Sequence, residues 1–163
     1  MDRTSVIAAM AAIDGDPAAV SSTAYACVDA LYVYPVKSCA GVRVSDVRFD
    51  EDGRIVGDRE WIVADARGEL AWLGSHPKLA LLQPKLLADA LLLCAQGQQP
   101  LRLSREAEGA ATYALIWHPE EHRMVSYRGR DAGALAAQFL REVTGHDLRL
   151  VKLDRNAALA TAP

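Results

Sequence analysis

Three polar side chains follow one another on a short connection that starts at Pro35 and ends at Gly41. Lys37 carries an ammonium with three donors, Ser38 a hydroxyl and Cys39 a thiol. Proline fixes its own φ and glycine permits a sharp backbone path, so the connection is constrained at both ends. An ammonium beside a hydroxyl suits a phosphate or another oxyanion. A solvated lysine in a polar turn is the competing interpretation, and composition alone favours it because exposed lysines are common.

A second cationic candidate is Arg59, which enters a predicted strand between Asp58 and Glu60. Its guanidinium is a planar, permanently charged fork that suits phosphate. A surface ion pair with one of the two flanking acids is the simpler interpretation when this residue is considered alone.

The spacing nevertheless suggests that these groups meet. If residues 42–49 run out from the Lys37 loop and a turn at 50–53 returns the chain, Arg59 comes back to the end of the sheet where Lys37 began. We therefore predict one solvent-accessible anion site formed by Lys37, Ser38 and Arg59, with no acid bound to either cation.

Two other patterns are weaker. Residues 118–122 read His-Pro-Glu-Glu-His, which matches an inverted zinc-peptidase motif, but that motif needs a helix and a distant third ligand. Because strand-like runs flank it, a polar hairpin turn is the preferred interpretation. Cys39 beside Lys37 would be an activated thiolate if the cation lowered its pKa, but a small residue filling a turn is preferred. No metal ligand and no catalytic residue is assigned.

The elements that must position these residues are mostly short apolar runs closed by turn residues. A single helix is predicted over residues 131–144, with Asp131 as N-cap and Gly145 just past its end. The predicted strands are 28–34, 42–49 with a bulge at 45–46, 60–64, 69–72, 78–87 broken by Pro84, 90–95, 100–103, 112–117, 123–127 and 148–153, and the helix's apolar face is Leu135, Phe139, Leu140 and Val143. The pattern predicts a mainly-β fold, a closed or partly closed β-barrel of about seven short strands with hairpins and one C-terminal α-helix.

Composition narrows the class of protein. The 163 residues are 51% hydrophobic, which suits one domain, and the net charge of −3 argues against a nucleic-acid partner. Three widely spaced cysteines favour a reducing compartment, hence a cytoplasmic location, and the apolar run at residues 6–13 is too short to span a membrane. We expect a disordered tail at residues 1–25, the domain at 26–155, and a tail or linker at 156–163.

Two segments read together resemble a known family. Residues 31–41 (Leu-Tyr-Val-Tyr-Pro-Val-Lys-Ser-Cys-Ala-Gly) and 57–65 (Gly-Asp-Arg-Glu-Trp-Ile-Val-Ala-Asp), with Gly68 behind, are similar to the opening of the N-terminal β-barrel of MOSC (molybdenum-cofactor sulfurase C-terminal) proteins. The similarity continues through residues 76–81, the strand ending at Trp117 and the segment 148–151, and so covers nearly everything after the tail. Pro-Val-Lys-Ser followed at this spacing by Asp-Arg-x-Trp is its most specific part.

The resemblance implies a function that the residues alone do not show. The family carries this barrel in front of a MOSC domain; its members include bacterial oxidoreductase-like proteins, mitochondrial amidoxime-reducing components and the C-terminal part of molybdenum-cofactor sulfurases. It implies a molybdenum cofactor (molybdopterin) held between the two domains, with Lys37, Ser38 and Arg59 matching the barrel's grip on phosphate and pterin. The metal-ligating cysteine belongs to the second domain, and nothing here corresponds to it. The chain also departs from the family, because Gly74 and Ser75 stand where members often have an arginine before the His-Pro segment.

The leading hypothesis is therefore a binding half-site, whose partners are a C-terminal MOSC domain (same gene or separate chain) and a small anionic ligand. Redox or sulfur-transfer chemistry is expected to need that second domain. Residues 153–163 are expected to lie near the junction with it. The chain alone is expected to be no enzyme, to lack bound cofactor, and to touch neither nucleic acid nor membrane. The alternative is a stand-alone interaction module without a cofactor.

Overall fold

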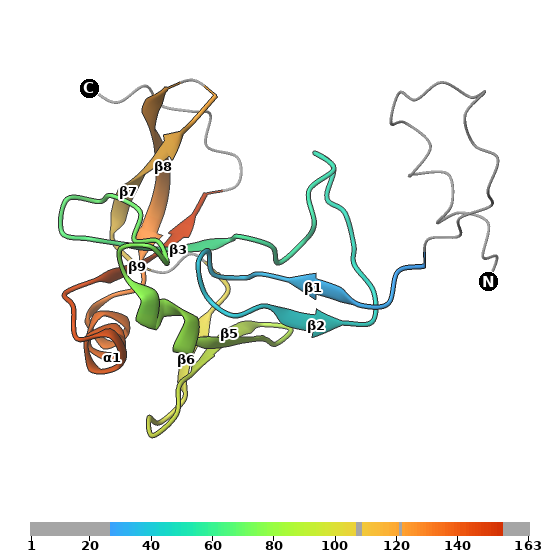
Figure 1. The fold of residues 1–163 in the computed structure, drawn as a ribbon, viewed down its shortest axis with the longest axis horizontal. Coiled ribbons are helices and arrows are strands. Elements are labelled where there is room, and N and C mark those ends of the chain that lie inside the picture. Colours follow the sequence, from blue (N-terminus) through green and yellow to red (C-terminus); the bar gives the residue numbers. More distant parts are fainter. Residues whose placement is uncertain (1–26, 107–108, 121, 155–163) are drawn as a thin grey trace.

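The computed structural model describes residues 27–106, 109–120 and 122–154. These residues form nine strands, one α-helix and one 3₁₀ helix (Figure 1). In chain order they are β1 (Leu31–Val33), β2 (Val42–Val44), β3 (Trp61–Ala64), η3 (Pro77–Leu81), β4 (Gln83–Leu86), β5 (Ala90–Cys94), β6 (Leu101–Ser104), β7 (Ala111–His118), β8 (Arg123–Asp131), α1 (Ala134–Thr144) and β9 (Arg149–Leu153). The predicted mainly-β fold with one late helix is confirmed over the described residues.

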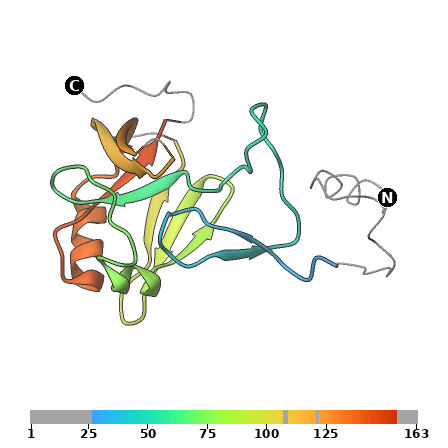
Figure 2. The ribbon, with the colours of Figure 1, turned by 45° about the horizontal axis from the view of Figure 1, so that its top comes forward.

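The strands form three antiparallel sheets. Their orders are β1-β2, β3-β9-β8-β7 and β4-β5-β6. Both views show β1 and β2 as a two-stranded arm that extends away from a body made of the other two sheets and α1 (Figures 1 and 2). None of the three sheets closes on itself within the described part of the chain. The closed barrel predicted from the sequence is therefore not confirmed.

The core forms on both faces of β3, whose four residues are all buried. Trp61 and Val63 belong to the larger hydrophobic cluster, while Ile62 and Ala64 belong to a smaller one on the other face. This follows from the period-two alternation of a strand. The larger cluster also takes in Phe139 of α1, Leu79 of η3 and residues of the two larger sheets. β3 is thus anchored on both sides, and the candidate cation Arg59 lies in the segment just before it.

The helix boundaries differ slightly from the prediction. Helix α1 begins at Ala134 after Gly133, and Asp131 ends β8 instead of capping the helix. The Asp131 carboxylate still accepts a hydrogen bond from the Gly133 N–H at 2.8 Å, which explains why an acidic residue stands just before the helix. Gly145 adopts a left-handed φ of 81° and closes the helix as predicted.

The predicted apolar face of α1 is wrong at one position. Leu135 is 71% exposed, while Ala136, Phe139 and Leu140 are buried. The small Ala136 lets the helix lie close to the sheets, and the buried stripe is rotated toward it. The prediction counted large apolar residues only, so it placed Leu135 on the buried face instead of Ala136.

Several predicted strands are shorter than expected or are replaced; the one at 28–34 is reduced to Leu31–Val33. The strand at 42–49 ends at Val44, and only an isolated bridge joins Phe49 to Ile55 across the predicted turn. The strand at 69–72 is reduced to isolated bridges of Glu69 and Leu70, after a turn in which the Gly68 N–H donates to the Asp65 carbonyl at 3.0 Å. These short pieces lack a continuous partner strand.

Residues 78–87 differ most from the prediction. Pro77 starts the 3₁₀ helix η3, because its fixed φ suits a first helical turn. Within this range only residues 83–86 form a strand, β4. Pro84 pairs in register with Leu93, and β4 tolerates it because this strand lies at the edge of its sheet.

Several predictions about the chain ends lie outside the described residues. The tail predicted at residues 1–25 and the C-terminal segment at 156–163 fall there, and the boundaries of the domain stay a prediction. Among the described residues, no helix has the length and apolar character that a membrane crossing requires.

Candidate anion-binding site

The two segments that carry the candidate cations lie side by side. The Arg59 N–H donates to the Tyr34 carbonyl at 2.7 Å, the Trp61 N–H to the Pro35 carbonyl at 3.0 Å, and the Lys37 N–H to the Trp61 carbonyl at 2.9 Å. The chain leaves along the arm and returns through residues 45–56 to reach this point (Figure 1). The predicted meeting of the Lys37 loop with the Arg59 segment is therefore confirmed for the backbone.

Ser38 and Arg59 have unusual backbone conformations. Their φ angles are 70° and 46°, and His122 is the one further non-glycine residue with positive φ among those the structure describes. Such conformations are strained for L-residues, and they cluster at sites where the surroundings hold them for function. Two of the three predicted site residues thus carry strain at the place where their segments meet.

The Arg59 side chain already has partners. Its guanidinium lies over the Tyr34 ring, 5.3 Å from the centroid, and Nη1 forms an ion pair with the Asp58 carboxylate. The other Asp58 oxygen accepts a hydrogen bond from the Tyr34 N–H at 2.8 Å. The prediction that neither cation has a bound acid is therefore wrong for Arg59, because a carboxylate on the adjacent residue reaches it directly.

The donors that remain suit a phosphate. Nη1 is engaged by Asp58, but a guanidinium has five N–H donors, and the Arg59 side chain is 57% exposed. Lys37 and Ser38 are half-buried, and neither side chain forms an ion pair or hydrogen bond within the described part of the chain. Two cations, one acid and one hydroxyl leave a net positive site, so the residues present fit an anionic group. Binding by Lys37, Ser38 and Arg59 itself stays a prediction.

Cys39 is not a nucleophile in this site. Its side chain is 6% exposed and belongs to the larger hydrophobic cluster. Burial raises the pKa of the Cys39 thiol to about 12. The thiol therefore stays protonated at neutral pH, and the interpretation of Cys39 as a residue that fills a turn is confirmed.

We expect Cys39 to resist alkylation in the folded protein. At pH 8 a thiol reagent should modify the exposed Cys27 quickly and Cys39 only after denaturant is added, as followed by peptide mass spectrometry. Burial of the neutral thiol stabilises the fold fully below its ordinary pKa of 9.0, and this contribution is lost as the pH rises toward about 12. Labelling of Cys39 at the rate of Cys27 would contradict this.

The segment from His118 to His122 forms a hairpin turn and not the helix that a zinc-peptidase motif needs. His118 ends β7, and the chain turns back into β8 at Arg123, so the segment is a hairpin turn as preferred. His118 Nε2 lies 2.6 Å from the Tyr127 hydroxyl. No group of three or more potential metal ligands occurs among the described residues.

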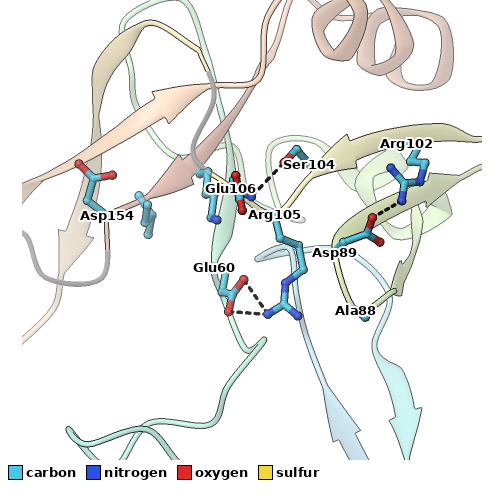
Figure 3. A pocket seen from close by; sticks show the side chains of 10 residues that line it. Glu60, Ala88, Asp89, Arg102, Ser104, Arg105, Glu106 and Asp154 are labelled. Atoms are coloured by element: carbon cyan, nitrogen blue, oxygen red, sulfur yellow. Dashed lines mark hydrogen bonds and ion pairs between the residues drawn. The ribbon is translucent and has the colours of Figure 1, made fainter.

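Sequence reasoning missed a polar cavity of about 750 Å³ beside the start of β3 (Figure 3). In it, Arg105 donates to both oxygens of the Glu60 carboxylate at 3.1 and 3.3 Å, and Arg102 pairs with Asp89 at 2.7 Å. The hydrogen bond from Arg102 lowers the pKa of the Asp89 carboxyl. The signal for the first pair is that Glu60 directly precedes a fully buried strand, where a carboxylate needs a partner.

The fold and the site together define a class of protein: a small mainly-β domain that presents cationic donors on paired loops. The model of the MOSC N-terminal beta barrel domain matches residues 25–147. The chain belongs to this family, and the predicted resemblance is confirmed.

Curated relatives point the same way. The chain is 27% identical to human molybdenum cofactor sulfurase over 78% of its length, and 32% identical to human mitochondrial amidoxime-reducing component 1 over 68%. It spans only 14% of the former and 32% of the latter. It is also 30% identical to bovine mitochondrial amidoxime reducing component 2, of which it spans 38%.

A solved structure resembles the fold. The solution structure of a Bordetella bronchiseptica protein superposes with a TM-score of 0.52 at 21% identity, covering 76% of this chain and 88% of that one. At this identity the likeness concerns the fold alone.

Proposed function

We propose that this domain supplies half of a molybdenum-cofactor site, in which Lys37, Ser38 and Arg59 bind the phosphate and pterin part of the cofactor. The observation that supports it is that Ser38 and Arg59, on segments hydrogen-bonded to one another, are both held at positive φ. A strained backbone that serves only an ordinary turn would not be expected at both places.

The three side chains have separate tasks in this proposal. Lys37 supplies a point charge, Ser38 a hydroxyl donor, and Arg59 the free part of its fork for a second phosphate oxygen. When bound, the cofactor supplies the metal centre for redox or sulfur-transfer chemistry. This chain's own residues bind and orient the anionic end, and none of them is assigned a catalytic step.

The rest of the site would come from a MOSC domain, in the same gene or on a separate chain. Support comes from the relatives, which are a molybdenum cofactor sulfurase and amidoxime-reducing components and are several times longer than the matched region. A reducing, cytoplasmic compartment belongs to the same proposal. A half-site leaves most of its ligand in water, so weak binding near ~1 mM is expected for phosphate alone.

The test is a phosphate titration of the ¹⁵N-labelled chain at constant ionic strength. We expect amide shifts centred on residues 36–40 and 57–60, and Arg59→Ala should weaken binding by about tenfold, because one charged hydrogen bond is lost. Arg102→Ala, on the separate cavity, is the matched control and should leave the affinity unchanged. Two results would overturn the half-site: amide shifts in these segments that persist unchanged in Arg59→Ala, or the absence of amide shifts there in the parent protein. Either would favour a stand-alone module without a cofactor.

A further inference from the structure

Tyr34 contacts residues 58 and 59 through its carbonyl, its N–H and its ring. Its carbonyl accepts the Arg59 N–H at 2.7 Å, and its own N–H donates to Asp58 at 2.8 Å. Its ring lies under the Arg59 guanidinium, 5.3 Å from centroid to Cζ. Backbone and side chain of Tyr34 therefore both fix the same neighbouring pair.

The position of the Tyr34 ring is itself restricted by Gly41. A methyl group built on Gly41 would lie 2.9 Å from Cε1 of the ring, closer than van der Waals contact allows. β1 and β2 are paired so that Val33 faces Val42, which brings Tyr34 to Gly41 at the end of the arm. A glycine at position 41 therefore leaves room for the Tyr34 ring, which from there reaches the Arg59 guanidinium.

Core packing does not account for this arrangement. The Tyr34 side chain is 39% exposed and belongs to neither hydrophobic cluster. Arginine is rich in rotamers, and a free guanidinium has to be ordered each time it binds an anion. An aromatic face below it and a carboxylate beside it do this ordering before the ligand arrives.

We propose that Tyr34 is the positioning residue of the anion site: with Gly41 leaving room for its ring, it holds the Arg59 guanidinium in place for a phosphate. This inference rests on the proposed function. Tyr34 does not touch the phosphate in this proposal; it acts through Arg59. Asp58 completes the hold through Nη1 and leaves the remaining N–H donors for the ligand.

The experiment compares Tyr34→Leu with its matched control Tyr34→Phe in the full chain, using inorganic phosphate as probe. Phenylalanine keeps the ring, so its affinity should equal that of the parent protein. Leucine should weaken binding by about two- to fivefold, the range expected for an exposed cation–π contact. Gly41→Ala moves the ring without removing it, and it should weaken binding in the same direction.

A second readout separates positioning from mere stability. The ¹⁵N relaxation of the Arg59 Nε–H group should show greater fast motion in Tyr34→Leu and Gly41→Ala than in the parent or Tyr34→Phe. Unchanged affinity and unchanged Arg59 motion in Tyr34→Leu would overturn the inference, as would an equal loss in Tyr34→Phe. If Arg59→Ala leaves phosphate affinity unchanged, the proposed function itself is wrong. If Arg59→Ala lowers the affinity and Tyr34→Leu does not, only the role of Tyr34 is refuted.

Discussion

Replacing Glu60 with alanine is expected to lower the free energy of unfolding by about 3 kcal/mol, because it breaks an ion pair that is largely withdrawn from water. The Glu60 side chain is 8% exposed and its partner Arg105 24%. The same carboxylate accepts a hydrogen bond from the Gly57 N–H at 3.0 Å. Alanine leaves both donors without this acceptor.

The position of Glu60 between three parts of the fold explains why its loss should lower the free energy of unfolding so strongly. The residue precedes β3 in the four-stranded sheet, Arg105 follows β6 in the three-stranded sheet, and Gly57 lies on the segment returning from the arm. One carboxylate thus joins all three parts: it accepts from Gly57 and from Arg105, and the second of these contacts is drawn in Figure 3. The loss stays at the lower end for a buried pair, because Arg105 can still reach water.

Urea denaturation of Glu60→Ala, Arg105→Ala and the double variant measures this effect. The double variant should cost less than the sum of the single ones, since each single change leaves the other partner uncompensated. Asp89→Ala is the matched control: it breaks the exposed pair on the same cavity and should change stability little. A loss below about 1 kcal/mol in Glu60→Ala would show that the pair is not a structural tie.

Local features of the sequence predicted a good part of the fold. The run Trp-Ile-Val-Ala at 61–64 forms a strand that is buried on both faces, and Gly145 ends the helix in the left-handed conformation. The turn at Asp65–Gly68 also forms as predicted. These features depend on a residue and its near neighbours, so one sequence is enough to find them.

What depends on distant partners could not be predicted in the same way. Glu60 and Arg105 are 45 residues apart, and nothing local in either segment indicates the other. The division of the strands into three sheets likewise depends on pairing between segments that are distant in sequence. For that reason the local pattern could not predict whether the sheets close into a barrel.

The candidate site shows both limits within a few residues. The meeting of the Lys37 and Arg59 segments follows from a strand that leaves and a turn that returns. The acid on Arg59 was only one of two alternatives, because Asp58 and Glu60 flank it equally in sequence. In the structure Asp58 pairs with Arg59 and Glu60 with Arg105. A regular strand would place residues 58 and 60 on one side, but the left-handed backbone of Arg59 between them interrupts that alternation.

Replacing Gly129 with alanine is expected to lower the free energy of unfolding by about 3 kcal/mol, through a backbone clash. Gly129 lies in β8, where it pairs with Leu153 of β9. An added methyl group would collide with the backbone oxygen of Lys152 and lie 2.8 Å from Cγ1 of Val151. A backbone oxygen in a sheet cannot rotate away as a side chain can, so β8 and β9 must separate.

The cost should spread through the sheet, because β9 lies between β8 and β3. Gly97→Ala is the control: its methyl group meets nothing within 4 Å, and its φ of 78° costs only about 1 kcal/mol of strain. Thermal unfolding of both variants, with amide exchange of the β8–β9 hydrogen bonds, measures the difference. Equal losses in the two variants would contradict the clash, because Gly129, unlike Gly97, does not have a left-handed φ. A larger loss with faster exchange in Gly129→Ala would establish that close approach of two strands selects glycine there.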